Sequence, residues 1–398
     1  MKHHIAVITL LAAFSPSLFA IDADSFFLLD VEDSCISTKE LMSGEKKEYQ
    51  QSPDILPENS FIIFKPQKDI KSDITNINTL QEKVEDFFEK KNIAPADINN
   101  EIMQKITPHS LIQILKSALQ DNDLLEAMAK RSYIHVMGFT KIVLLVGPKD
   151  KNYKVRLHLW WPNKEGTAQK LILEDKHVHK WDFASKMFSG GFEDQLYVTS
   201  DVREGEKLSY IRLTEKLSKL PKEEQDKIYN SLSAIENAMY GKSKFQKKKF
   251  RCSIDKKNIY TKNEIIEKLD LSEKDFIDIL SVHESYVTMP NISGEYGLKK
   301  VGLKHLSFPV IYDIDDGYGY FHRHNLSHRL MSDPDDMVAT LVITYPPIDT
   351  VEPYILMRSE EGEDITKVAP ILTKERLIEQ ITRFIKYMED KNSIPNKP

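Results

Sequence analysis

Two histidines separated by one residue, His177 and His179, have the type and spacing that could begin a metal site. Side chains alternate between the faces of a β-strand, so both imidazoles would point to the same side if this segment is a strand. The apolar run at 171–173 indicates a strand, and Gly190 and Gly191 end the segment. Neutral imidazole binds Zn, Fe, Cu and Ni. The pair therefore predicts one side of a metal site; the alternative is a surface strand with two solvated histidines.

The run HVHKWDFASKMFSGG at 177–191 resembles the first metal-binding motif of the cupin superfamily, in which His-X-His lies on a strand and a glycine follows at the next turn. It is most similar to cupin-like proteins that have an aromatic residue, Asp or Asn, Phe and Ser after the histidines. Cupins supply a further histidine from a second motif, and 325–330 matches it. The resemblance covers about 135–185 and 305–347 and implies His328 as the third ligand.

The sequence departs from the cupin pattern at one ligand. Many cupins have a glutamate four or five residues after the second histidine, where this chain has Phe183 and Ala184. Asp182 is the nearest acid, but its parity places it on the opposite face of a straight strand, and it would need a β-bulge to reach the metal. The site therefore resembles the three-histidine site of the thiol-dioxygenase branch of cupins, formed by the three histidines already named.

A second His-X-His pair, His322 and His324, lies just before the second motif. These histidines could replace His328 as ligands, or the pair could form a second site. Tyr318 and Tyr320 precede the pair, and either phenol could act in catalysis by donating a hydrogen bond to bound dioxygen.

Strand-like segments surround the first motif. Residues 134–147 are rich in β-branched side chains, and 153–162 alternates so that Arg156 and His158 share one face. These two side chains could line the mouth of a pocket, or they could lie on an outer face. Alternation resumes at 208–213. Antiparallel strands joined by turns fit a jelly roll or a small barrel.

The expected fold class is α+β: a cupin-like antiparallel jelly roll or barrel elaborated by N-terminal helices, a helical insertion and a C-terminal helix. Apolar residues at helical spacing mark the helical regions, and the long separation of the two histidine motifs requires an insertion. In chain order the expected regions are a signal peptide (1–20), an irregular and helical region (21–133), the first half of the barrel (134–213), the helical insertion (214–285), the second half of the barrel (286–350), and a C-terminal helix and tail (351–398).

The N-terminal segment has the pattern of a secretory signal peptide. Lys2 begins a short basic region, 5–14 is apolar, and Ala20 offers a small residue at a cleavage point. A buried N-terminal helix or strand is the alternative. Export predicts a secreted or periplasmic protein, in which Cys35 and Cys252 could form a disulfide. No later segment has the run of apolar residues that a transmembrane helix needs.

Composition favours a globular protein. The chain has 398 residues and a net charge of −6, with 29% charged and 41% hydrophobic residues. These fractions argue against disorder, and the acidic balance gives no nucleic-acid signature. The basic segment 242–257 predicts a solvated loop, with an anionic partner as the alternative. A small molecule is the expected partner, and the cupin resemblance is compatible with a homo-oligomer.

Three imidazoles add no negative charge to a divalent metal ion and leave two or three coordination positions open. This arrangement suits Fe(II)-dependent dioxygenation of a small molecule, so Fe(II) is the expected cofactor, with Zn, Mn and Ni as alternatives. The same histidines with a bound water would make a hydrolase or lyase site. A non-catalytic cupin that binds a sugar or a small acid is a third reading, because one fold hosts many functions.

Overall fold

The computed structural model describes residues 56–67, 71–90, 93–135, 138–162, 172–173, 175–239, 259–290, 295–332, 337–358 and 365–393. The signal peptide expected at 1–20, both cysteines and the basic segment 242–257 lie outside the described residues, so those expectations stay predictions.

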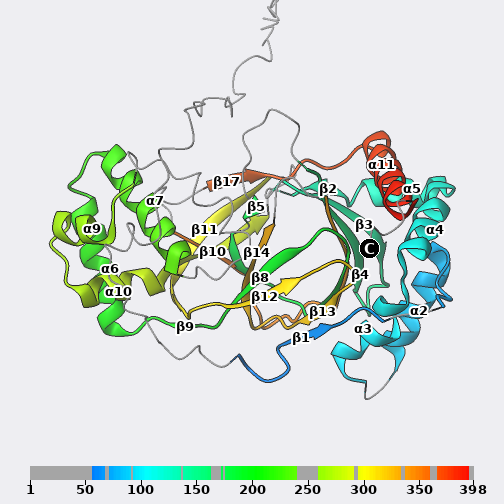
Figure 1. Ribbon diagram of the computed structural model, residues 1–398, viewed down its shortest axis with the longest axis horizontal. Coiled ribbons are helices and arrows are strands. Elements are labelled where there is room, and N and C mark those ends of the chain that lie inside the picture. Colours follow the sequence, from blue (N-terminus) through cyan, green and yellow to red (C-terminus); the bar gives the residue numbers. More distant parts are fainter. Residues whose placement is uncertain are drawn as a thin grey trace, which may run out of the picture.

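Two antiparallel sheets form the centre of the molecule (Figure 1). The strands of the first sheet are β1 (Phe61–Phe64), β2 (Tyr133–Ile134), β3 (Thr140–Val146), β4 (Lys154–Trp160), β7 (Phe183–Ser189), β13 (Gly319–His322) and β15 (Val338–Thr344). They follow the order β1-β13-β7-β15-β4-β3-β2, so strands far apart in sequence are neighbours in space. Folding this sheet therefore joins the N-terminal segment to both of the expected barrel halves.

The second sheet has ten strands. They are β5 (Ile172–Leu173), β6 (Lys176–Val178), β8 (Phe192–Tyr197), β9 (Thr199–Asp201), β10 (Val282–Pro290), β11 (Glu295–Leu306), β12 (Val310–Ile314), β14 (Ser327–Ser332), β16 (Tyr354–Met357) and β17 (Ile365–Val368). The main path is β12-β8-β14-β6-β16-β10-β11-β17, with β5 paired to β14 and β9 paired to β11. One of the two sheets curls into a half-barrel. The segment 351–398, expected as a helix and tail, also contributes β16 and β17.

Apolar side chains from both sheets pack together in the space between them. Phe192, Ile314 and Leu330 come from the ten-stranded sheet, whereas Phe183 and Val342 come from the seven-stranded sheet. Burial of this aromatic and aliphatic surface stabilises the face-to-face arrangement, since each strand turns alternate side chains towards it. The expected α+β class, with antiparallel strands around a common core, is confirmed at this level.

Helices cover the outer face of the seven-stranded sheet (Figure 1). They are α2 (Ile77–Glu89), α3 (Ile98–Glu101), α4 (Pro108–Leu119), α5 (Asn122–Ala129) and α11 (Lys374–Ser393), with 3-10 turns at Pro95–Asp97 and Met103–Lys105. The first turn of α4 illustrates why they start where they do: Thr107 and Ser110 exchange side-chain to backbone hydrogen bonds around Pro108. The C-terminal helix α11 packs against α4 and α5, so both chain regions share one core with the sheet.

The helical insertion lies at the other end of the molecule and has its own apolar core (Figure 1). Its helices are α6 (Glu204–Leu217), α7 (Lys222–Met239), α9 (Lys262–Lys268) and α10 (Glu273–Ser281). The expectation of a strand at 208–213 is wrong, because these residues belong to α6. Tyr210 and Leu213 are buried at helical spacing, whereas Leu208 and Ile211 are exposed. The two exposed apolar residues produced the misleading alternation.

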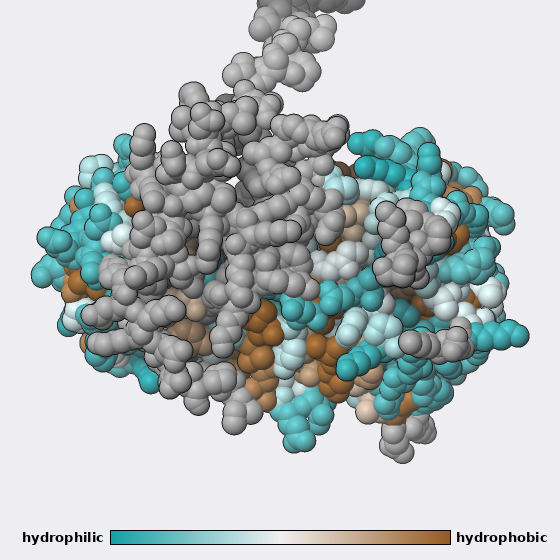
Figure 2. All heavy atoms as spheres, in the orientation of Figure 1, coloured by the Kyte–Doolittle hydropathy of each residue, from teal (hydrophilic) through white to brown (hydrophobic). Residues whose placement is uncertain are grey.

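Hydrophilic side chains cover most of the described surface at the two helical ends, and hydrophobic residues are exposed mainly over the strands between them (Figure 2). Among the residues that the structure describes, no helix combines the length and the apolar character needed to cross a membrane.

Candidate metal centre

Strand register brings the two histidine motifs together. His177 on β6 lies directly opposite His328 on β14, so the two side chains are on the same face of the ten-stranded sheet. This face is turned towards the other sheet, because Leu330, two residues after His328, belongs to the core between the sheets. His179 follows His177 by two residues, just beyond the end of β6.

Three imidazole rings converge at this point. One ligand atom from each of His177, His179 and His328 lies within 4.8 Å of the other two. The ring centroid of His177 is 4.6 Å from those of both other rings, and the remaining pair is 5.1 Å apart. Nε2 of His179 is 3.1 Å from Nε2 of His328. The structure thus brings together the three histidines selected from the sequence, and the group could hold a metal ion.

Hydrogen bonds on the far side of two rings fix which nitrogen faces the centre. Nδ1 of His328 lies 3.0 Å from Oδ1 of Asp194, and Nδ1 of His177 lies 2.8 Å from the carbonyl oxygen of Asp175. A carbonyl oxygen and an ionised carboxylate can only accept, so with Asp194 ionised each Nδ1 carries the proton and each Nε2 keeps its lone pair. Orienting partners of this kind are the usual supports of histidines that bind metals. The donor set therefore fits a divalent cation.

Burial keeps the three imidazoles neutral. It lowers the pKa of His177 and of His328 to about 3, and it lowers the pKa of His179 well below the ordinary value. The neighbouring imidazoles lower the pKa of His177 and His179 further. A neutral imidazole offers a free lone pair, so these side chains can bind a cation at pH 7 without first losing a proton.

Asp182 and His324, two of the alternate ligands, bind each other. Oδ1 of Asp182 accepts a hydrogen bond from the backbone N–H of His324 at 2.9 Å and lies 2.6 Å from Nδ1 of the same residue. Neither belongs to the group of three converging histidines. Their contact connects the loop after His179 to the segment that follows β13. The other alternate, His322, lies beside the cluster, with its ring centroid 4.5 Å from that of His328.

Arg156 lies near the cluster but does not touch it. Its side chain is buried, and the guanidinium carbon lies 5.1 Å from the centroid of the Trp181 ring. Trp181 in turn stacks on His179 at 5.5 Å, so one indole separates the positive charge from the imidazole. His158, on the same strand as Arg156, packs instead beside the aromatic ring of Phe139 at 5.1 Å.

Tyr320 is one aromatic ring removed from the histidines. Phe183 lies between them, with its centroid 5.9 Å from Tyr320 and 5.2 Å from His179. Tyr320 is buried, whereas Tyr318 is half-buried and packs at the margin of the core between the sheets. The ring of Tyr320 thus packs on Phe183, which in turn packs on His179.

Asp194 is the residue of the centre that the sequence did not single out. It lies on β8, the strand next to β14, and its side chain is fully buried. Burial raises its pKa to about 7. The signal that could have found it is the run Glu193, Asp194 and Gln195, three consecutive polar residues within a strand that is buried along its whole length. A buried acid in such a strand requires a partner.

The opposite face of β6 carries a buried charge cluster that the sequence also did not predict. Nζ of Lys176 binds Glu236 of α7 and lies 2.8 Å from Nε2 of His283. Nε of Arg358 donates to the same carboxylate at 3.4 Å. Since Lys176 precedes His177, one short strand supports the candidate metal centre on one face and anchors the helical insertion on the other.

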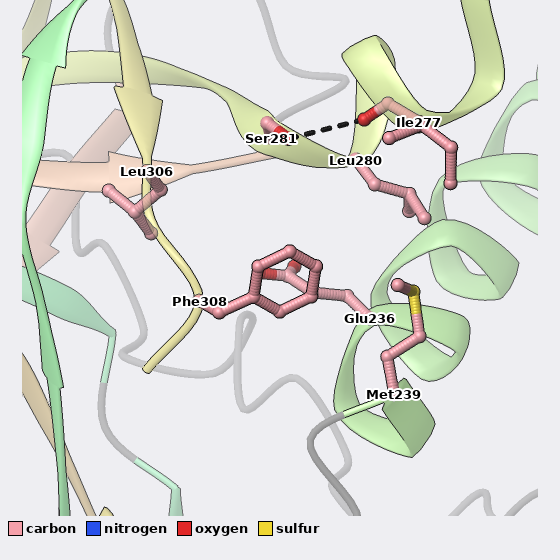
Figure 3. A pocket seen from close by; sticks show the side chains of 7 residues that line it. All are labelled: Glu236, Met239, Ile277, Leu280, Ser281, Leu306 and Phe308. Atoms are coloured by element: carbon pink, nitrogen blue, oxygen red, sulfur yellow. Dashed lines mark hydrogen bonds between the residues drawn. The ribbon is translucent and has the colours of Figure 1, made fainter. Parts of the chain in front are cut away.

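A small pocket lies beside this charge cluster, between α7, α10 and the end of β11 (Figure 3). Its lining residues are Glu236, Met239, Ile277, Leu280, Ser281, Leu306 and Phe308. None of the three converging histidines lines it, so this pocket and the candidate metal centre are different places.

Replacing Asp194 with asparagine should weaken metal binding by about 10–100-fold, the usual effect of losing a carboxylate that orients a metal-binding histidine. Asparagine keeps the shape and an accepting oxygen for His328 Nδ1 but removes the negative charge. Metal affinity measured by competition with a chromophoric chelator checks this. Asp201→Asn, at an exposed position on β9, is the matched control. Equal affinity of the wild type and Asp194→Asn would show that Asp194 does not support the site.

No protein-family model matches this sequence, and no match is found among the curated proteins. The likeness to cupins therefore rests on the two histidine motifs and on the antiparallel sheets that position them.

Proposed function

We propose that this chain is an exported cupin-like metalloprotein whose three histidines, His177, His179 and His328, bind one divalent metal ion. The convergence of their ligand atoms to within 4.8 Å is the observation that carries the proposal. Two antiparallel sheets packed face to face, with the histidines between them, are compatible with a cupin jelly roll. We further propose that the activity is an Fe(II)-dependent dioxygenation of a small molecule.

The three neutral imidazoles support this choice of chemistry. Nitrogen ligands without a carboxylate suit Fe(II), Zn, Ni and Cu, and carboxylate-rich sites suit Mn and Mg better. Bound Fe(II) would supply the redox chemistry and open positions for the small molecule and dioxygen. The chain itself supplies orientation: Asp194 holds the ring of His328, while Trp181 and Phe183 pack on His179 from two sides.

The side chain of Arg156 is the reason to expect that the bound molecule is an anion. A buried guanidinium stays charged in a protein, and its aromatic contact with Trp181 leaves its N–H donors suited to a carboxylate. This observation favours a small organic acid as the bound molecule, whether as the substrate of a dioxygenase or, in the second candidate function, as the ligand of a non-catalytic binding module.

Metal analysis of the purified protein tests the proposal. The expected result is about one divalent metal ion per chain, with oxygen uptake when Fe(II)-loaded protein is mixed with small thiols or organic acids. Stoichiometric zinc without oxygen uptake would favour a hydrolase or lyase, and a bound acid without any metal would favour the binding module. Wild-type protein that binds no divalent metal, even after incubation with it, would refute the metal site. Mass spectrometry of the mature chain, expected to begin at Ile21, tests export.

A further inference from the structure

We infer that His322 is a fourth ligand of the same metal ion, supplied from the opposite sheet. This inference rests on the proposed function, because it needs the metal site formed by the other three histidines. It adds a ligand that the cupin resemblance does not imply: His322 lies on β13 of the seven-stranded sheet, whereas His177 and His328 lie on strands of the ten-stranded sheet.

The imidazole of His322 makes no hydrogen bond of good geometry with the described residues, and the backbone of Arg323 is a weak polar neighbour that acts on its pKa. The side chain is fully buried, and neither Nδ1 nor Nε2 makes a hydrogen bond within the described part of the chain. An imidazole always has at least one N–H donor and one accepting nitrogen when neutral, and burying both unsatisfied is unfavourable. Burial lowers its pKa well below the ordinary value, so the ring is neutral and has one nitrogen with a lone pair. A metal ion would satisfy that lone pair.

The position of His322 relative to the other rings fits one shared ion. Its centroid is 4.5 Å from that of His328, which is as close as the proposed ligands His177 and His328 are to each other at 4.6 Å. Its centroid is 6.4 Å from that of His179, so these two rings lie across the cluster from one another. The nitrogens of His322 lie outside the group of three, and rotation about the Cβ–Cγ bond, which is soft in histidine, would turn one inward.

His322 also takes the place of the glutamate that many cupins have. The expected position of that glutamate is Phe183 in this chain, and Phe183 pairs in register with His322 on the neighbouring strand. The two rings stack at 4.9 Å with an angle of 13° between their planes. The phenyl ring thus packs flat against the imidazole of His322. A ligand from each sheet means that the bound ion would connect the two sheets.

Substitution of His322 with leucine gives effects of opposite sign on the metal-free and metal-bound protein. The metal-free variant should melt at an equal or higher temperature, because an unsatisfied buried imidazole is replaced by an apolar side chain of similar size. Its metal affinity should fall at least as far as the roughly 10–100-fold that loss of a supporting residue costs, and the rise in melting temperature on adding metal should shrink accordingly. A residue that only fills space would not change the metal affinity in this way.

His158→Leu is the matched control. It removes another interior imidazole of the same sheet that has an unpartnered nitrogen, Nε2, but it does not alter the histidine cluster. Metal affinity of this variant should equal that of the wild type. X-ray absorption of the wild-type protein loaded with Co(II) gives a readout that needs no variant: four imidazole ligands are expected, and three in His322→Leu.

The experiment separates the fourth ligand, His322, from the three-histidine metal site. If the wild type binds Co(II) through three imidazoles and His322→Leu binds it equally well, His322 is not a ligand and the three-histidine site stands. If the wild type binds no metal, the proposed function and the fourth ligand are both refuted.

Discussion

Replacing His328 with alanine should abolish stoichiometric metal binding, with a loss of affinity that exceeds the roughly 10–100-fold typical of losing a supporting residue, because a direct ligand is removed. The expected effect is larger than that of Asp194→Asn, because His328 has the central position: its Nε2 faces that of His179, and its strand pairs directly with that of His177. Metal content after gel filtration and affinity measured by chelator competition check the prediction.

Two further variants make the result on His328 interpretable. His177→Ala removes a ligand whose Nδ1 binds only a backbone carbonyl, so no buried side chain loses its partner. His305→Ala removes a histidine that lies against Glu206 outside the centre. Loss of metal in both ligand variants and retention in His305→Ala is the expected pattern. Full metal content in His328→Ala, with a native circular dichroism spectrum, would refute the assignment of this residue.

Lowering the pH from 7 to 5.5 in the presence of a chelator should destabilise the fold by several kcal/mol. Burial holds the pKa of His177, His283 and His328 at about 3, whereas an unfolded histidine titrates near 6.5. Above pH 6.5 these histidines are neutral in both the folded and the unfolded state, so the free energy of unfolding does not change with pH on their account. Below it the unfolded state binds more protons, so each buried histidine lowers the free energy of unfolding by about 1.4 kcal/mol per pH unit until the pH approaches 3.

These three histidines together lower the free energy of unfolding by about 4 kcal/mol between pH 7 and pH 5.5. His158, His179 and His322, whose pKa values also fall well below the ordinary value, add to this effect. Asp194 opposes it, because its raised pKa of about 7 lets the folded state take up a proton before the unfolded state does. The stabilisation that Asp194 gives on lowering the pH is about as large as the destabilisation caused by one of the histidines.

Urea unfolding curves at pH 7 and pH 5.5 measure the change. The midpoint should fall steeply over this interval, well above the range in which ordinary carboxylates titrate. His158→Leu, which removes a half-buried imidazole whose pKa also falls well below the ordinary value, should show a weaker pH dependence by about 1.4 kcal/mol per pH unit. An unchanged midpoint between the two pH values would mean that the buried histidines exchange protons as freely in the folded state as in the unfolded one.

The amino-acid sequence by itself determined the three histidines of the centre and the general class of the fold. His177 and His179 could be recognised because their spacing matches the period of a strand, which is a local property. His328 came from the resemblance of 325–330 to the second motif of cupins. Local periodicity failed at 208–213, where two exposed apolar residues of α6 imitated a strand and only packing in the insertion decided for a helix.

Only the tertiary structure decided what surrounds these histidines. Asp194 supports His328 because β8 and β14 are neighbours, and His322 reaches the cluster because the two sheets face each other. The same folding pairs Asp182 with His324 and removes both from the group of ligands. These contacts join residues far apart in the chain, and their existence depends on strand order and register, which are set by the summed packing of both sheets rather than by any short stretch of sequence.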